Sequence, residues 1–130
     1  MAGLKPGITG EAAVTVDHSN TAVAYGSGGV SVFATPAMIG LMEKAALSSV
    51  DPLLESGMTT VGTRVDVQHL AATPVGMKVV AISELVEVEG KRLVFRVEAR
   101  DEVEVVGRGI HERYIVPEQK FLARAAAKKK

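Results

Sequence analysis

The sequence predicts an α+β domain in which a five-stranded antiparallel sheet wraps around one long helix. Three observations support this class. An apolar helical segment lies in the first half of the chain, a period-two pattern fills the second half, and a short predicted strand precedes the helix. A chain of 130 residues with 47% hydrophobic residues suits a single domain over residues 1–130.

The helix is predicted from Pro36 to about Val50. Thr35 stands directly before Pro36, and this is the usual pair of N-cap and first helical residue. Asp51-Pro52 ends the helix, because the residue before a proline is disfavoured in helical geometry. The segment is apolar nearly all round, so we expect it to be buried. Its apolar residues are Ala37, Met38, Ile39, Leu41, Met42, Ala45, Ala46 and Leu47.

The strands are predicted from alternation and from turn signals between the alternating runs. A short strand over Glu11–Val16 precedes the helix, and four longer strands follow it. The four are Met58–Leu70, Met77–Val88, Arg92–Arg100 and Val103–Val116. Their links are short, so neighbouring strands are expected to be antiparallel. A sheet wrapped around a helix in this way is the hot-dog architecture, and its open edge or face favours a dimer.

Charge and composition narrow the classes of function. The chain has 15 basic and 15 acidic side chains and 4% aromatic residues, which does not suit a nucleic-acid partner. Neither a signal-peptide pattern nor a run of about 18 apolar residues is present, so we expect no membrane partner and a cytoplasmic location. The absence of cysteine is compatible with a reducing compartment and excludes thiolate metal sites. Residues 123–130 are expected to be a frayed basic tail.

Glu43 is the most informative residue of the predicted helix. Helical spacing places it in line with the apolar residues Ile39, Ala46, Leu47 and Val50. Burial raises the pKa of a carboxyl group, and a raised pKa suits a general base or acid near neutral pH. A salt bridge to an arginine, or a place at the end of an amphipathic face, would explain the same residue without chemistry. The pattern leaves both interpretations open.

His69 ends a strand whose odd positions are apolar, so we expect it at the rim of the packed face. A histidine there titrates near pH 7, and together with Glu43 it suits the activation of water at an acyl carbonyl. A hydrogen-bonded structural histidine is the alternative. Thr35 is either a helix cap or a hydroxyl that attacks or holds water. About 12 Å of helix separates Thr35 from Glu43, so they share a site only if the segment folds back or two protomers join.

Two further residues are candidates for ligand binding. Gly62 interrupts a strand, where glycine permits a bulge or the close approach of a ligand to the backbone. Arg113 follows His111 and Glu112 in the last strand and suits a phosphate or carboxylate, with an exposed cross-strand charge pair as the alternative. No role is assigned to His111 or His18. No phosphate loop, metal-spaced cluster, nucleophile elbow or dinucleotide fingerprint is present, so we expect no bound metal.

Four segments carry a resemblance to a known family. They are Phe33–Glu43, Val61–Thr63, His69–Gly76 and Gly107–Arg113. In this order, and with closely similar spacings, they resemble the fluoroacetyl-CoA thioesterase family of hot-dog proteins over about residues 32–116. Upstream of Thr35 the likeness weakens, because residues 20–32 offer only Tyr25 where the fluoroacetyl-specific enzyme has phenylalanines over its acyl pocket. Selectivity for a fluorinated acyl group is therefore not implied.

The resemblance implies a homodimer or dimer of dimers that hydrolyses a small or medium acyl-CoA to the free acid and coenzyme A. It implies catalytic roles for Thr35, Glu43 and His69, and it places Gly62 and Arg113 against the acyl-CoA. No metal or redox cofactor is required, since coenzyme A enters as part of the substrate. Two alternatives are a dimer that binds acyl-CoA without turnover and an enoyl-CoA hydratase. The hydratase is disfavoured because the sequence lacks the Asp and His spacing of that motif.

Overall fold

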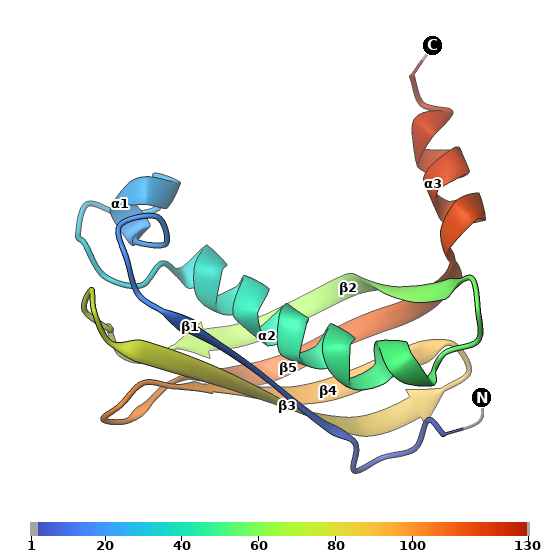
Figure 1. The fold of residues 1–130 in the computed structure, drawn as a ribbon, viewed down its shortest axis with the longest axis horizontal. Helices are drawn as coiled ribbons and strands as arrows, with labels where there is room; N and C mark the ends of the chain where they lie inside the picture. The colour runs from blue at the N-terminus through green and yellow to red at the C-terminus, as the bar shows by residue number, and fades with distance from the viewer. Residues whose placement is uncertain (1–2, 130) are drawn as a thin grey trace.

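The structure is a computed structural model that describes residues 3–129. A five-stranded antiparallel sheet curls around the long helix α2, which confirms the predicted α+β class (Figure 1). The elements in chain order are β1 (Thr9–Thr15), α1 (Ala22–Tyr25), α2 (Thr35–Val50), the 3-10 turn η1 (Asp51–Leu53), β2 (Met58–His69), β3 (Lys78–Glu89), β4 (Arg92–Arg100), β5 (Val105–Pro117) and α3 (Glu118–Ala126). The ends of the predicted strands differ from these bounds by at most two residues.

The sheet has the strand order β1-β3-β4-β5-β2, and every neighbouring pair is antiparallel. Short links join β3 to β4 and β4 to β5, as predicted. β2 and β3 run in opposite directions as well, but they do not pair, because β2 pairs with β5 and forms the edge opposite β1. Two strands lie between β2 and β3, a gap of about 14 Å at the usual strand spacing, and the eight residues 70–77 span it easily.

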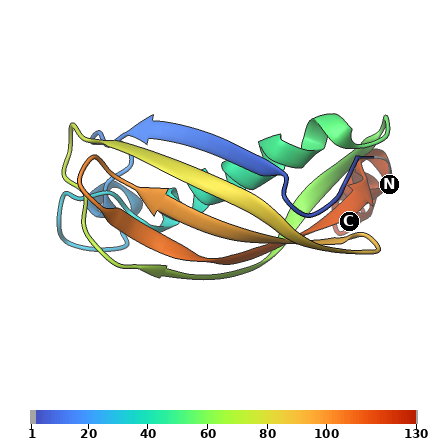
Figure 2. The same cartoon turned by 90° about the horizontal axis from the view of Figure 1, so that it is seen from below.

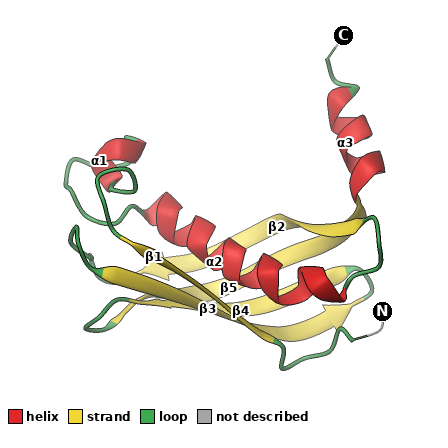
Figure 3. Cartoon of the chain, viewed as in Figure 1, coloured by secondary structure: helices red, strands yellow, loops and turns green. Residues whose placement is uncertain are grey.

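α2 packs against the concave face of the sheet through one side only (Figures 2 and 3). Its buried residues are Met38, Leu41, Met42, Ala45, Ala46 and Val50. The helix lies very close to β1, since a Cβ atom at Gly10 would overlap the carbonyl oxygen of Ala45. The opposite side, with Gly40 and Lys44, is exposed. The helix is therefore buried along a stripe and not all round, as its composition had suggested.

Two helices were not predicted. α1 is one short turn, in which the Thr21 hydroxyl accepts a hydrogen bond from the Ala24 amide and Gly26 ends the helix with a φ of 69°. α3 occupies Glu118–Ala126 and buries none of its residues. It includes residues 123–126, where the sequence predicted a frayed end, because a run of alanines favours helix even without packing. Figure 1 shows α3 projecting away from the sheet.

Candidate functional site

Thr35 and His69, two of the predicted catalytic residues, meet where α2 begins and β2 ends. The Oγ1 atom of Thr35 lies 2.8 Å from Nδ1 of His69, within hydrogen-bond distance. Thr35 is the first residue of α2, and Ala34 occupies the cap position without a side-chain cap bond. The prediction of a threonine cap was therefore wrong. The hydroxyl is turned toward the imidazole on β2 and not toward the amides of its own helix.

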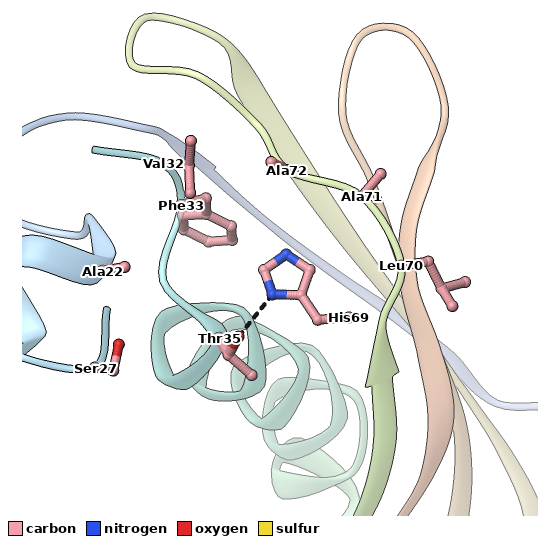
Figure 4. A pocket seen from close by; sticks show the side chains of 9 residues that line it. All are labelled: Ala22, Ser27, Val32, Phe33, Thr35, His69, Leu70, Ala71 and Ala72. Atoms are coloured by element: carbon pink, nitrogen blue, oxygen red, sulfur yellow. Dashed lines mark hydrogen bonds between the residues drawn. The ribbon is translucent and has the colours of Figure 1, made fainter. Parts of the chain in front are cut away.

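The pair lies in a hollow of about 340 Å³. Its other lining residues are Ala22, Ser27, Val32, Phe33, Leu70, Ala71 and Ala72. Figure 4 shows the imidazole between the start of α2 and the segment that follows β2, with Ala22 and Ser27 on the far side of Thr35. The walls are small or apolar side chains, so the hydroxyl and the imidazole are the main polar side-chain groups that meet there.

His69 has the protonation behaviour of a proton acceptor. Burial lowers its pKa, and a contact with the backbone of Ala71 opposes that shift. A lowered pKa favours the neutral ring near pH 7, and a neutral ring has one nitrogen that accepts a proton. Among the described residues, Nε2 of His69 is buried without a hydrogen-bond partner. The geometry therefore allows Nδ1 to accept the proton of the Thr35 hydroxyl.

Glu43 lies two helical turns away, in a second cluster with Gly62 and Arg113. The Oε2 atom of Glu43 is 3.9 Å from Nη1 of Arg113. A Cβ atom at Gly62 would lie only 2.8 Å from the same carboxylate oxygen, so only glycine allows this approach. The register of β2 against β5 shifts between Gly62 and Arg64, which confirms the bulge that the glycine suggested.

The burial of this cluster differs from the expectation. The Glu43 side chain is 40% exposed, because it lies at the border of the packed side of α2. The prediction of a desolvated carboxylate was therefore wrong for the isolated chain. Arg113 is buried instead, with a side chain that is 7% exposed, so it is not an exposed cross-strand pair. Burial lowers the pKa of Arg113, and the charges of Glu43 and Asp51 oppose this shift.

Sequence reasoning missed two residues that hold Arg113 in place. The hydroxyl of Thr60 accepts from Nε of Arg113 at 2.8 Å, and the carbonyl of Thr60 accepts from Nη2 at 2.9 Å. Nε2 of His111 lies 3.2 Å from Nη1. A signal for His111 was available, since residues two apart on a strand share one face of the sheet. No comparable signal pointed to Thr60, which lies on the neighbouring strand.

The two clusters are separate within one chain. α2 is continuous from Thr35 to Val50, so about 12 Å of helix axis separates Thr35 from Glu43. The arrangement in which the Thr35 segment folds back onto Glu43 is thereby excluded. Within residues 3–129, no group of three His, Cys, Asp or Glu side chains is placed to hold a metal ion. In the same part of the chain, no helix has the length and apolar character that crossing a membrane requires.

Comparisons with known proteins identify the family. The family described as fluoroacetyl-CoA-specific thioesterase matches residues 16–119. The fluoroacetyl-CoA thioesterase of Streptantibioticus cattleyicolor is 46% identical over 97 residues, which cover 75% of this chain and 70% of that protein.

Solved structures agree with this match. The fluoroacetyl-CoA thioesterase FlK superimposes with a TM-score of 0.92 and 37% identity, over 98% of this chain and 99% of that one. A thioesterase superfamily member from Thermus thermophilus gives a TM-score of 0.91 and 30% identity, over 99% and 96% of the two chains. The predicted hot-dog fold is confirmed. The chain belongs to the fluoroacetyl-CoA-specific thioesterase family of hot-dog thioester hydrolases.

Proposed function

We propose that this enzyme hydrolyses a small or medium acyl-CoA to the free acid and coenzyme A, with Thr35, His69 and Glu43 as catalytic residues. The observation that carries the proposal is the 2.8 Å approach of the Thr35 hydroxyl to His69 inside the hollow. A hydroxyl beside a neutral imidazole is the usual arrangement for activating a weak nucleophile. The names of the relatives specify a coenzyme A thioester as the substrate of those proteins.

The first chemical step forms an acyl-threonine ester. Oγ1 of Thr35 attacks the thioester carbonyl carbon while its proton passes to Nδ1 of His69. The carbon–sulfur bond then breaks, and the sulfur of coenzyme A takes that proton and leaves as a thiol. The first amides of an α-helix have no intrahelical partners, so the start of α2 is suited to stabilise the oxyanion of the tetrahedral intermediate.

The second step returns the enzyme to its starting state. Water attacks the ester carbonyl and its proton passes to a general base. The bond between the acyl carbon and Oγ1 of Thr35 then breaks, the base returns that proton to Oγ1, and the acid leaves. Glu43 is the base that we assign to this water, since its carboxylate is half exposed and beside Arg113. Gly62 and Arg113 are assigned to the acyl-CoA. Their support is the close approach of Gly62, Glu43 and Arg113 to one another.

The mechanism requires a homodimer, because one chain keeps the two clusters apart. β2 offers the surface for pairing. It is an edge strand of 12 residues, and Val65 in its second half is 40% exposed. Antiparallel pairing of two such edges about a twofold axis near Val65 would bring His69 of one copy opposite Gly62 of the other. Thr35 and His69 of one protomer would then face Glu43 of its partner.

The chemistry described uses no metal or cofactor, and coenzyme A enters only as part of the substrate. The cytoplasmic location stays a prediction from the sequence. Localisation of a tagged copy in the native host would test it separately.

The first experiment is the release of coenzyme A from a panel of short, branched, aromatic and long acyl-CoA thioesters. The chain has no cysteine, so the thiol signal comes from the product alone. We expect turnover of short and medium chains, and a loss of about a hundredfold or more in His69→Ala, the usual size for a removed general base. Binding of acyl-CoA without any turnover by the folded protein would replace the proposal with a binding function. Mass spectrometry of the quenched reaction distinguishes an acyl-threonine ester from direct attack by water.

A further inference from the structure

We propose that His111 is a positioning residue, whose Nε2 atom accepts a hydrogen bond from Arg113 and holds the guanidinium beside Glu43 and Gly62. Its effect on catalysis rests on the proposed function, in which the Arg113 cluster faces the substrate. Its effect on the position of Arg113 does not depend on that function.

The hydrogen bonds of His111 select one protonation state. Nδ1 lies 2.8 Å from the carbonyl oxygen of Arg64, and a carbonyl only accepts, so Nδ1 must carry a hydrogen. Nε2 lies 3.2 Å from Nη1 of Arg113, and a guanidinium only donates, so Nε2 must be unprotonated. His111 is therefore a neutral ring that donates to β2 on one side and accepts from Arg113 on the other.

Three acceptor atoms hold the Arg113 guanidinium, and they leave one hydrogen on Nη1 and one on Nη2 outside these bonds. Its Nε and Nη2 donate to the hydroxyl and the carbonyl of Thr60, and its Nη1 donates to His111. Nη1 carries a second hydrogen, and the Glu43 carboxylate lies 3.9 Å from this nitrogen. Together with the two bonds to Thr60, the bond to His111 holds the guanidinium plane, and it occupies one hydrogen of Nη1 so that the other is left for the Glu43 side of the cluster.

The imidazole itself has little freedom to move. His111 is 1% exposed. Its ring stacks on Phe95, with the ring centroids 6.3 Å apart and the planes inclined by 29°. A Cβ atom at Gly62 would lie 3.3 Å from Cε1 of His111, so the bulge in β2 closes the remaining side. A packed core ring thus acts as a rigid support for Arg113.

The electrostatic surroundings are consistent with the neutral ring. Burial lowers the pKa of His111, and the charge of Arg113 lowers it further. The Arg64 carbonyl on β2, Glu43 on α2 and Glu112 on β5 oppose the shift. The net shift is downward, so the ring stays neutral at neutral pH and remains able to accept.

Two substitutions test the roles of the two ring nitrogens of His111 separately. In His111→Asn, the short amide takes the place of Nδ1 and keeps a donor for the Arg64 carbonyl, but nothing reaches Arg113. In His111→Gln, the longer side chain brings an amide oxygen to the place of Nε2, where it accepts from Arg113. We expect kcat/KM for the best thioester to fall about ten- to a hundredfold in His111→Asn, the effect of losing one hydrogen bond to a charged group. The His111→Gln variant should stay within about threefold of the parent enzyme.

The double variant distinguishes positioning from a general loss of packing. If His111 acts through Arg113, His111→Asn causes no further loss in an Arg113→Lys background. Losses that multiply would overturn the proposal, and so would equal activity in His111→Asn and the parent enzyme. Thermal melting identifies any variant that fails to fold. If His111→Asn fails to fold, the comparison of His111→Gln with the parent enzyme is used instead.

A spectroscopic experiment tests the role of His111 without any catalytic activity. Nitrogen-15 spectra of the parent protein should show His111 as the neutral form protonated on Nδ1, and the signal of the Arg113 Nη1–H that donates to His111 should be protected from exchange. That signal should persist in His111→Gln and broaden or vanish in His111→Asn. A hydrogen on Nε2, or an Arg113 signal unchanged in His111→Asn, would overturn the proposal. If the parent enzyme hydrolysed no thioester, the proposed function would fail while this experiment still decided the role of His111.

Discussion

The Thr35 hydroxyl lies 2.8 Å from Nδ1 of His69, although 34 positions separate the two residues in the chain. The start of α2 supplies one group and the end of β2 supplies the other. Both residues are therefore held by the backbone of regular elements and not by a mobile loop. Elements of this kind hold a catalytic pair within the narrow range of geometry that proton transfer requires.

Replacement of Thr35 should separate catalysis from stability. We expect Thr35→Val to lower kcat about a hundredfold or more, because the side chain keeps its shape and loses the attacking oxygen. Thr35→Ser keeps that oxygen and should retain most of the activity. Thr35 makes no cap bond, so Thr35→Val should cost at most about 1.5 kcal/mol of unfolding free energy, the effect of one lost hydrogen bond. Steady-state kinetics and urea denaturation test this, and full activity in Thr35→Val would contradict it.

The pH dependence of hydrolysis should follow His69. The ring must be neutral to accept the hydroxyl proton, and burial lowers its pKa from the usual 6.5. We therefore expect kcat/KM to be constant just above pH 6.5 and to fall in acid, with a midpoint below 6.5. The acid limb should persist in His111→Gln, which lacks the other histidine with a shifted pKa. A midpoint above 6.5 would show that His69 is not the base.

The stability of the fold should respond to pH in the same range. The pKa of His111 is lowered in the folded protein, so the unfolded chain binds a proton first as the pH falls. The contribution is fully present above about pH 6.5 and is lost below it, by at most about 1.4 kcal/mol per pH unit for each such histidine. Urea denaturation between pH 5.5 and 7.5 should show this slope, and His111→Gln should reduce it.

Glu112 provides a comparison for the pH dependence of stability. Hydrogen bonds from Arg92 and Arg64 lower the pKa of Glu112, so its contribution is lost only as the pH falls below the usual carboxylate range. The two titrations therefore fall in different windows. A slope between pH 5.5 and 7.5 that is identical in His111→Gln would exclude His111 as its source.

Local signals predicted the elements, and they failed where the outcome depends on distant partners. The bounds of β4 were predicted correctly, because turn residues lie on both sides of a strictly alternating run. The end of α2 at Val50 followed from Asp51-Pro52 in the same way. The pairing of β2 with β5 was missed, because it joins two strands that are far apart in the chain. A local sequence pattern contains no information about such a non-local pairing.

In the candidate site, too, the sequence predicted the residues but not their contacts with distant partners. Thr35, Glu43 and His69 were selected from residue type and spacing, and the contact of Thr35 with His69 required the folded chain. The burial of Glu43 was overestimated, because an apolar stripe on a helix does not tell which side meets the sheet. His111 was left without a role, since its role depends on the hydrogen bond that it accepts from Arg113.

A methyl group at Gly62 should disturb the Glu43 cluster specifically. In Gly62→Ala, the added Cβ would lie 2.8 Å from Oε2 of Glu43 and 3.3 Å from Cε1 of His111, so the carboxylate must move. We expect a fall in kcat/KM of at least about tenfold, because small displacements of catalytic groups are costly. Gly29→Ala is the control, since a Cβ there meets nothing within 4 Å. Equal kinetics of the two variants would show that the approach of Gly62 to Glu43 has no part in the reaction.

Mixed dimers test whether the site joins two protomers. Thr35→Val and Glu43→Gln are each expected to be nearly inactive as homodimers. When they are co-expressed in equal amounts, half of the dimers contain one chain of each kind, and each mixed dimer has one intact site. The mixture should therefore recover about a quarter of the parent activity.

Thr35→Val mixed with His69→Ala supplies the matched control. Thr35 and His69 contact each other within one chain, so every site in that mixed dimer lacks one of them. This second mixture should recover nothing, because subunit exchange alone creates no complete pair. Recovery in both mixtures would mean that the Thr35 and His69 partners also come from different chains. Recovery in neither would mean that Glu43 serves the Thr35 of its own chain, which α2 could allow only by unwinding between the two residues, since an intact helix holds them about 12 Å apart.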